Sequence, residues 1–354
     1  SMINVDQVDG FSFGFKLYMG SYVKNSENYK LLDFKKSKLN LSYKLNDKFD
    51  VSISTSYTKR DKLNLDNVYF NYHINDSSVL SVGSISALFD MYFEKSEDHL
   101  SIIVPTVNKA TSFFAKTKGL GFVYKNNIND NFTFHVSFVG KNLNNSHDDR
   151  NIFTLRAFYF NEYKNNLIHV GLNNNFIHND KENVNTVAVN NIYTKFPVKK
   201  LNSTGIEFAS RIKSLTIESG AFYAKINPFV NELSHKYFDS YSIYSEVTYV
   251  VTGEVKNYDK LNGVIKKIKV KNPVSQGGIG AIELVARYQF TDAISERGNY
   301  TIDMGRHNIF LFGVNWLPTN HCKVLLNYST IDSSHRNKNK ERNNNFRAEY
   351  RLFF

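Results

Sequence analysis

The chain has 354 residues, of which 42% are hydrophobic and 15% aromatic, with 29 Phe and 22 Tyr but one Trp. No run of 18 apolar residues occurs, which excludes a transmembrane helix, and the single cysteine, Cys322, excludes internal disulfides and structural zinc clusters. The formal net charge of +11 is compatible with nucleic-acid binding, an anionic lipid surface, an anion-attracting cavity, or simply lysine-rich surface loops.

Apolar and polar residues alternate with a period of two along most of the chain. In the first segment, Phe11, Phe13 and Phe15 alternate with Ser12 and Lys16. Such alternation indicates half-buried strands. We expect sixteen strands, at 10–22, 31–45, 48–58, 66–74, 78–87, 117–126, 131–140, 151–162, 166–178, 203–213, 215–226, 238–251, 277–290, 308–317, 322–331 and 344–354.

Short and long connections alternate between these strands. Asn, Asp and Pro clusters indicate tight turns, at 46–48, 75–76, 129–130, 165–166 and 318–320. Longer polar connections are expected near 59–66, 141–150, 177–202, 227–237, 291–307 and 332–343. This layout is typical of outer-membrane barrels, in which periplasmic turns are short and extracellular loops are long. The fold class is therefore all-β: one domain over 1–354 that forms a 16-stranded antiparallel transmembrane β-barrel, with both termini on the periplasmic side.

The last expected strand, 344–354, carries a more specific pattern. Phe346, Tyr350 and Phe354 lie on one face, and Arg347 and Arg351 lie on the other. An alternating strand that ends in a C-terminal Phe is similar to the assembly signal of bacterial outer-membrane barrels, and we assign that role to Phe354. The alternative is an ordinary edge strand of a soluble protein, but an exposed aromatic edge is an aggregation hazard. We therefore expect localisation to the bacterial outer membrane.

The beginning of the chain shows no secretory signal peptide. Ser1-Met2 is interpreted as an expression remnant placed before a mature protein.

Several segments resemble the phosphate-selective porin O and P family. They follow one another in the family's order: VLSVGSISAL at 79–88, the hairpin 119–140, the central hairpin 204–226, the strand 239–254 that ends in Thr-Gly-Glu, the strand 281–292, and IFLFGVNWLP at 309–318. The resemblance implies a trimeric 16-stranded channel, whose pore is narrowed by the third loop, the fifth loop and an unusual periplasmic turn. This sequence has long insertions at all three places, 88–116, 177–202 and 252–276.

Basic residues in these insertions and on the inward strand faces are the candidate pore-lining, anion-binding residues. Anion pores use Arg and Lys on their walls, and a charge on the lipid face is costly, so strand charges are expected to point inward. The candidates are Lys266, Lys267, Lys269 and Lys271 of the periplasmic turn, Lys109 and Lys116 of the third loop, and Lys16, Arg156, Arg211 and Arg287 of the strands.

Two interpretations of the strand charges stay open. Alternation also points Lys38, Lys44 and Arg347 inward. The strand arginines could instead form wall salt bridges that only hold shape, such as Arg287 with Glu283. Arginines are few, which favours a general anion pore over a strict phosphate filter, since Arg suits phosphate through its planar fork.

The expected function is a passive porin that prefers anions such as phosphate, in outer-membrane lipid and as a homotrimer. The alternatives are a non-selective general porin or a loop-based adhesin or receptor barrel. No enzyme activity, cofactor or metal is expected, because His73, His135, His169 and His178 are scattered and accompany no serine signature. Nucleic-acid binding is not expected, because the basic residues form no aromatic-interleaved patch.

Overall fold

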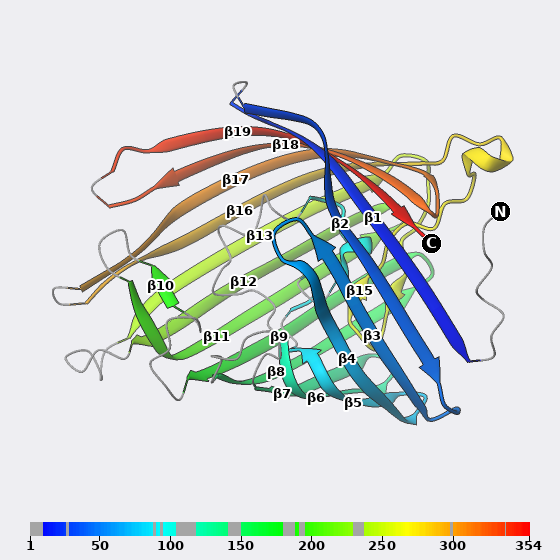
Figure 1. Cartoon of the computed structure of the whole chain (residues 1–354), viewed down its shortest axis with the longest axis horizontal. Coiled ribbons are helices and arrows are strands. Elements are labelled where there is room, and N and C mark those ends of the chain that lie inside the picture. The colour runs from blue at the N-terminus through cyan, green and yellow to red at the C-terminus, as the bar shows by residue number, and fades with distance from the viewer. Residues whose placement is uncertain are drawn as a thin grey trace.

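The computed structural model describes residues 10–25, 28–87, 90–92, 95–103, 118–140, 150–179, 188–190, 195–228, 237–297, 300–336 and 338–354. Sixteen antiparallel strands form a closed barrel (Figure 1). β1 (Phe11–Lys24) pairs with β2 (Asn28–Lys44) on one side and with β19 (Glu341–Phe353) on the other. The predicted fold class is confirmed.

The remaining wall strands follow one another around the barrel in chain order. They are β3 (Phe49–Thr58), β4 (Lys62–Asn75), β5 (Ser78–Ser86), β6 (Lys118–Asn129), β7 (Phe132–Val139), β8 (Arg150–Tyr163), β9 (Asn166–Asn179), β11 (Lys195–Ile212), β12 (Leu215–Pro228), β13 (Phe238–Val250), β16 (Ala281–Arg297), β17 (Tyr300–Thr319) and β18 (Cys322–Ser334). A short β10 (Ala188–Asn190) pairs with the start of β11. The hairpin of β14 (Tyr258–Asp259) and β15 (Val264–Ile265) lies between β13 and β16. Two 3₁₀ turns, η1 (Glu97–His99) and η5 (Val274–Gln276), complete the described elements.

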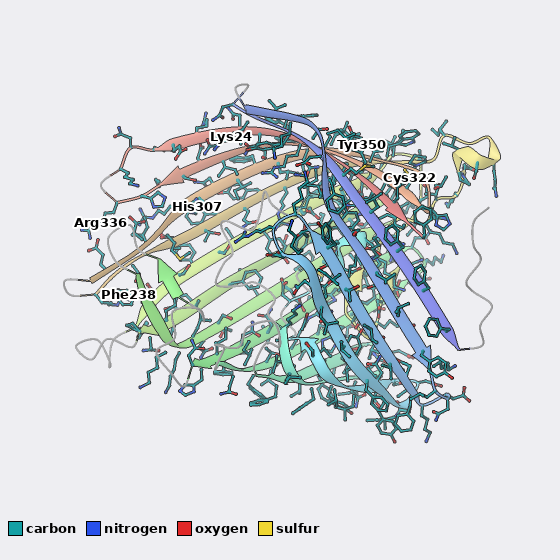
Figure 2. The ribbon with its side chains drawn as sticks, in the orientation of Figure 1. Lys24, Phe238, His307, Cys322, Arg336 and Tyr350 are labelled. Carbon is teal, nitrogen blue, oxygen red and sulfur yellow. The ribbon has the colours of Figure 1, made fainter. Side chains whose placement is uncertain are left out.

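The two ends of the barrel differ as the sequence predicts. The tight turns and the C-terminal Phe354 lie at one end, where the 250–280 segment also emerges (Figure 1). Cys322 lies toward that end, whereas Phe238 and Arg336 lie toward the opposite end (Figure 2). No described helix is long and apolar enough to cross a membrane.

Some strands extend further than the sequence predicts. The expected loop 291–307 is mostly ladder, because β16 continues to Arg297 and β17 begins at Tyr300. The expected fifth loop 177–202 is shorter for the same reason, since β9 runs to Asn179 and β11 starts at Lys195. Polar residues end the apolar alternation without ending the pairing, because backbone hydrogen bonds do not require a lipid-facing side chain.

Outward side chains form the apolar surface of the barrel. On β9, Ile168, Val170 and Leu172 are exposed, whereas the neighbouring His169 and Asn173 face inward and are buried. The same alternation holds on β13 and β16. A lipid-facing band of this kind needs a closed sheet, because lipid offers no partner to an open backbone edge.

Inward side chains are buried on one part of the wall and partly exposed on another. On β7, β9, β11 and β13 the inward residues are almost all buried. On β1 to β4, inward residues such as Lys16, Lys38, Asn40, Ser42 and Ser52 are only half-buried. Other segments of the chain therefore cover the inner wall from β7 to β13, and the space inside β1 to β4 remains open.

The C-terminal residue completes the closure of the barrel. The Phe354 N–H donates to the Phe15 carbonyl at 2.8 Å, and the Phe15 N–H donates to the Phe354 carbonyl at 3.0 Å. We expect deletion of Phe354 to lower the amount of heat-modifiable barrel in outer-membrane fractions, measured by gel mobility. Phe346→Ala removes another outward Phe of β19 and serves as the control; an equal loss in both variants would contradict a special role for Phe354.

Candidate pore constriction

The third loop leaves β5 at Ser86 and docks on distant strands of the wall. Tyr244 on β13 donates its hydroxyl to Asp90 at 2.9 Å, and Tyr92 donates its hydroxyl to Glu246 at 3.2 Å. Lys95 forms a 2.5 Å ion pair with Glu218 on β12, and both side chains are almost fully buried. The loop therefore crosses the inside of the barrel.

The next part of the loop is held by β17, β18 and β19. Lys323 donates its ammonium to the Leu100 carbonyl at 2.7 Å, and Asn315 donates its amide to the Ser101 carbonyl at 2.8 Å. The Ile103 N–H donates to Asn327 Oδ1 at 2.8 Å. These side chains satisfy loop backbone groups that would otherwise be buried without partners.

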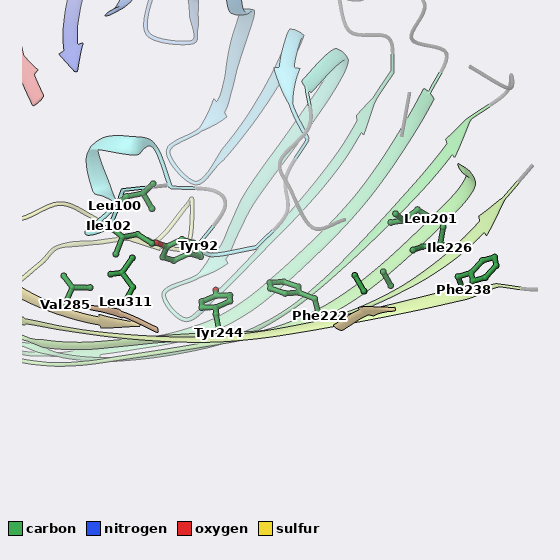
Figure 3. Packing of buried hydrophobic residues seen from close by; sticks show 12 residues of the cluster. Tyr92, Leu100, Ile102, Leu201, Phe222, Ile226, Phe238, Tyr244, Val285 and Leu311 are labelled. Atoms are coloured by element: carbon green, nitrogen blue, oxygen red, sulfur yellow. The ribbon is translucent and has the colours of Figure 1, made fainter. Parts of the chain in front are cut away.

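Apolar contacts support the same docking. Tyr92, Leu100 and Ile102 of the loop belong to one buried cluster with Tyr244 and Val285 of the wall (Figure 3). Burial of such side chains stabilises each by about 1.5–3 kcal/mol, so the loop is fixed by packing as well as by polar contacts.

The turn between β13 and β16 also enters the barrel. Arg156 on β8 donates to the carbonyls of Asn262 and Gly263 at 2.6 and 2.8 Å, and Arg211 on β11 donates to the Lys256 carbonyl at 2.7 Å. His135 on β7 donates to the Leu261 carbonyl at 2.6 Å. The turn thus lies against the inward face of β7, β8 and β11.

Gly263 permits this close approach. Its φ is 62°, and a side chain there would collide with the ring of Phe158. Only glycine adopts this conformation without strain and also leaves room for the aromatic ring.

The loop and the turn meet inside the barrel. Lys256 donates to Ser101 Oγ at 3.2 Å and forms an ion pair with Glu283 on β16. The Lys267 N–H donates to His99 Nδ1 at 3.0 Å. Together these two segments cover the buried part of the inner wall and leave the side of β1 to β4 open.

One buried carboxylate serves both segments. Glu207 on β11 accepts a hydrogen bond from the Met91 N–H of the loop, and it forms a 2.9 Å ion pair with Arg156, which holds the turn. Both charged side chains are fully buried. Removing one partner of a buried pair leaves an uncompensated charge, so this pair fixes the geometry of the constriction.

A cavity of about 480 Å³ lies on the open side. Its lining includes the inward residues Lys16, Lys38 and Asn40 of β1 and β2, and Ser96 of the third loop. Asp98 of the loop forms a 2.5 Å ion pair with Lys16, and Glu97 forms a 3.2 Å ion pair with Lys36. The constriction therefore lies between η1 and the wall of β1 and β2.

Lys38 is a basic residue of this wall that forms no ion pair in the described part of the chain, although the carboxylates of Asp66 and Glu97 attract it from a longer distance. It stands opposite Lys16 in the β1–β2 register, and no ion pair or hydrogen bond of its ammonium occurs within the described residues. A half-buried ammonium without a partner is free to interact with a passing anion.

The three candidate arginines face inward but do not reach the open space. The side chains of Arg156 and Arg287 are fully buried, and that of Arg211 is 3% exposed. Arg287 pairs with Glu246 at 3.4 Å instead of with Glu283, because Glu246 is its register partner on the neighbouring strand, whereas Glu283 lies four residues away along β16. Their positions correspond to anchors of the loop and the turn, and not to the expected pore-lining role.

The candidate lysines are distributed over different environments. Lys16 borders the cavity, Lys266 and Lys267 are half-buried, and Lys269 and Lys271 are exposed in the returning part of the turn. Residues 266–271 form no strand, and Ile268 and Val270 pack against Val250, Ala281 and Leu317. Lys109 and Lys116 lie outside the described residues.

Sequence reasoning did not identify the buried carboxylates as the groups that receive the loop and the turn, and it named Glu283 only as a possible wall partner of Arg287. Glu207, Glu218, Glu246 and Glu283 all lie in the inward phase of consecutive wall strands. That shared phase was a usable signal, because an isolated buried carboxylate is costly and predicts a cationic or N–H partner.

The acidic tip of the third loop is ionised at neutral pH. Burial alone would raise the pKa of Glu97 and of Asp98, but the charge of Lys36 lowers the first and that of Lys16 lowers the second, so both pKa values lie below their usual range. Burial lowers the pKa of His99 to about 4. The neutral form of His99 agrees with Nδ1 acting as an acceptor for the Lys267 N–H.

A family model described as phosphate-selective porin O and P matches residues 11–354. The chain belongs to this family. The porin is therefore a channel of the bacterial outer membrane, which confirms the resemblance and the localisation inferred from the sequence.

Solved structures share the fold at low sequence identity. OprB of Pseudomonas putida at high pH has a TM-score of 0.65 and 8% identity, over 98% of this chain and 94% of that one. The loop-deletion mutant OmpTdeltaL8 of Vibrio cholerae has a TM-score of 0.63 and 13% identity, over 97% of this chain and 99% of that one. An anion-selective porin from Comamonas acidovorans has a TM-score of 0.59 and 8% identity, over 97% of this chain and 99% of that one.

One curated relative matches a part of the porin. It is an uncharacterized protein of Caulobacter vibrioides that is 30% identical over 89 residues, which are 25% of this chain and 17% of the relative's length.

We expect Arg156→Gln to release the turn from the wall. Glu207 would remain buried without its cation, so the free energy of unfolding should fall by about 3–5 kcal/mol. Because the turn would no longer occupy the lumen, single-channel conductance should rise. Arg306→Gln breaks an exposed pair with Asp292 on β16 and is the matched control. Unchanged conductance in Arg156→Gln would show that the turn does not restrict the pore.

Proposed function

We propose that this porin is a passive diffusion channel that prefers anions, with phosphate and other small anionic solutes among those it passes. The observation that carries the proposal is the row of inward lysines on the open side of the lumen. Lys36 and Lys38 of β2 and Lys16 of β1 border the constriction, and Lys38 lacks a carboxylate partner in the described part of the chain.

Charge on the rest of the inner wall supports this assignment. The inward carboxylates Glu207, Glu246 and Glu283 are paired with cations beneath the loop and the turn. They are buried and do not border the open cavity. Buried pairs contribute little net field, so the cations that form no ion pair, Lys38 among them, contribute most of the field along the open path.

The likeness to an anion-selective porin from Comamonas acidovorans agrees with the proposal but concerns the fold alone at 8% identity. A homotrimer is part of the proposal, since one of the similar structures is a trimer form of OmpT from Vibrio cholerae. Cross-linking of the porin in native membranes tests this part separately.

Lys38→Gln should weaken the anion preference. A unit charge at about 8 Å from an ion in water changes its energy by about 0.5 kcal/mol. Its loss acts with opposite sign on anions and cations, so the anion-to-cation permeability ratio should fall about fivefold. The measurement is the reversal potential of a planar bilayer in a KCl gradient.

The control is Lys48→Gln, which removes an exposed lysine from the tight turn between β2 and β3. Cation selectivity or equal permeability in the unmodified porin would exclude the anion preference and favour a general porin. Absence of conductance would favour the adhesin or receptor alternative.

The anion preference should increase in acid. Because the pKa values of Glu97 and Asp98 are lowered and that of His99 is about 4, the loop tip keeps its charge between pH 8 and pH 5. Below about pH 4 the carboxylates lose negative charge and His99 gains positive charge. Reversal potentials measured from pH 8 to pH 3 should therefore be flat and then shift toward anions. In His99→Gln only the carboxylate contribution should remain; a shift centred near pH 6 would contradict the assignment.

A further inference from the structure

A second cavity of about 230 Å³ opens beside the constriction, between β1, β2, β19 and the third loop. Its lining includes Tyr18, Lys35, Glu97, Ile103 and Arg347. The cations Lys35 and Arg347 lie here beside the aromatic ring of Tyr18 and the aliphatic side chain of Ile103.

Most charges around this cavity neutralise one another. Arg351 donates from Nε to Glu349 at 2.9 Å and from Nη1 to the Glu97 carbonyl at 2.8 Å. The Glu97 carboxylate pairs with Lys36 at 3.2 Å. Among the described residues, Lys35 and Arg347 are left without a carboxylate partner.

Arg347 is held in a fixed orientation. Its guanidinium carbon lies 4.5 Å from the centre of the Tyr22 ring, and stacking of this kind fixes the plane of the guanidinium. Its Nε is buried and has no hydrogen-bond partner. Tyr22 also forms a side-chain hydrogen bond with Arg347. A guanidinium at the wall of the cavity can donate charge-assisted hydrogen bonds to the oxygens of a carboxylate.

A second donor at the cavity is also unsatisfied. Tyr18 is only 3% exposed, and its buried hydroxyl has no hydrogen-bond partner. A buried donor without a partner costs about 1–3 kcal/mol, so a solute that accepts from it is favoured.

The third loop supplies the apolar side of the cavity. Ile103 is fixed because its N–H donates to Asn327, and Asn327 is the register partner of Arg347 in the β18–β19 pair. The loop therefore holds an aliphatic side chain beside the guanidinium. A hydrated inorganic oxyanion gains nothing from such a contact, whereas the hydrocarbon body of an organic acid does.

We propose that this cavity binds small organic carboxylates during their passage through the pore. The carboxylate lies on Arg347 and Lys35, and the apolar body lies against Ile103 and the ring of Tyr18. Binding of this kind must remain weak, because a channel solute has to leave again. The inference rests on the proposed anion-preferring channel and narrows its substrate class.

The test is single-channel block in planar bilayers with benzoate and with inorganic phosphate as probes. Benzoate should block at concentrations at which phosphate does not. Arg347→Lys keeps the charge but loses the fork, and benzoate block should weaken about tenfold. Ile103→Ser should weaken the block by benzoate and leave the effect of phosphate on the single-channel current unchanged. Lys48→Gln is the matched control, and Lys35→Gln provides a second variant if Arg347→Lys yields no heat-modifiable barrel.

The outcomes separate this inference from the proposed function. Equal benzoate block in the unmodified porin and in both Arg347→Lys and Lys35→Gln overturns the site, and equal block by phosphate and benzoate overturns the ligand class. If reversal potentials show anion preference but benzoate does not block the channel, the proposed function is supported and the inference is overturned. Benzoate block that depends on Arg347 in a channel without anion preference supports the carboxylate site and overturns the proposed anion preference.

Discussion

Closure of the backbone hydrogen-bond ladder in lipid is the constraint on which the rest of the structure depends. Lipid offers no partner to a free N–H or C=O group, so β1 must pair with β19 as well as with β2. Once the ring is closed, the period of two fixes which side chains meet lipid and which meet the lumen. A slip by one residue in any pair would turn the charged set outward, where each charge costs about 2–4 kcal/mol at mid-bilayer.

The inward charges then divide into two groups with different physical roles. Beneath the loop and the turn, carboxylates such as Glu207 and Glu283 are paired with Arg156 and Lys256. In that dry environment a pair is costly to break, so it holds backbone segments in place. On the open side, Lys38 meets water and lacks a partner in the described part of the chain. The paired charges therefore anchor the loop and the turn on one side of the lumen, and the lysines on the other side act on ions in the open path.

Particular elements show how far sequence reasoning reaches. The wall strands and the inward phase of Arg156, Arg211, Arg287 and Lys16 follow from alternation alone. The length of the β16–β17 hairpin does not, because its outer part mixes polar and apolar residues without a regular alternation. The partner of Arg287 also does not follow, since it is set by the register between β13 and β16.

The sequence by itself determined the barrel, its strands, the family and the presence of an internal loop and a long turn, because each of these leaves a local pattern. Only the tertiary structure decided which inward cations meet the open lumen. Arg156 and Lys38 have the same alternation, yet one is covered by the turn and the other borders the cavity. That difference arises from contacts such as Arg156 with Asn262, between residues about a hundred positions apart, and no local pattern encodes such a distance.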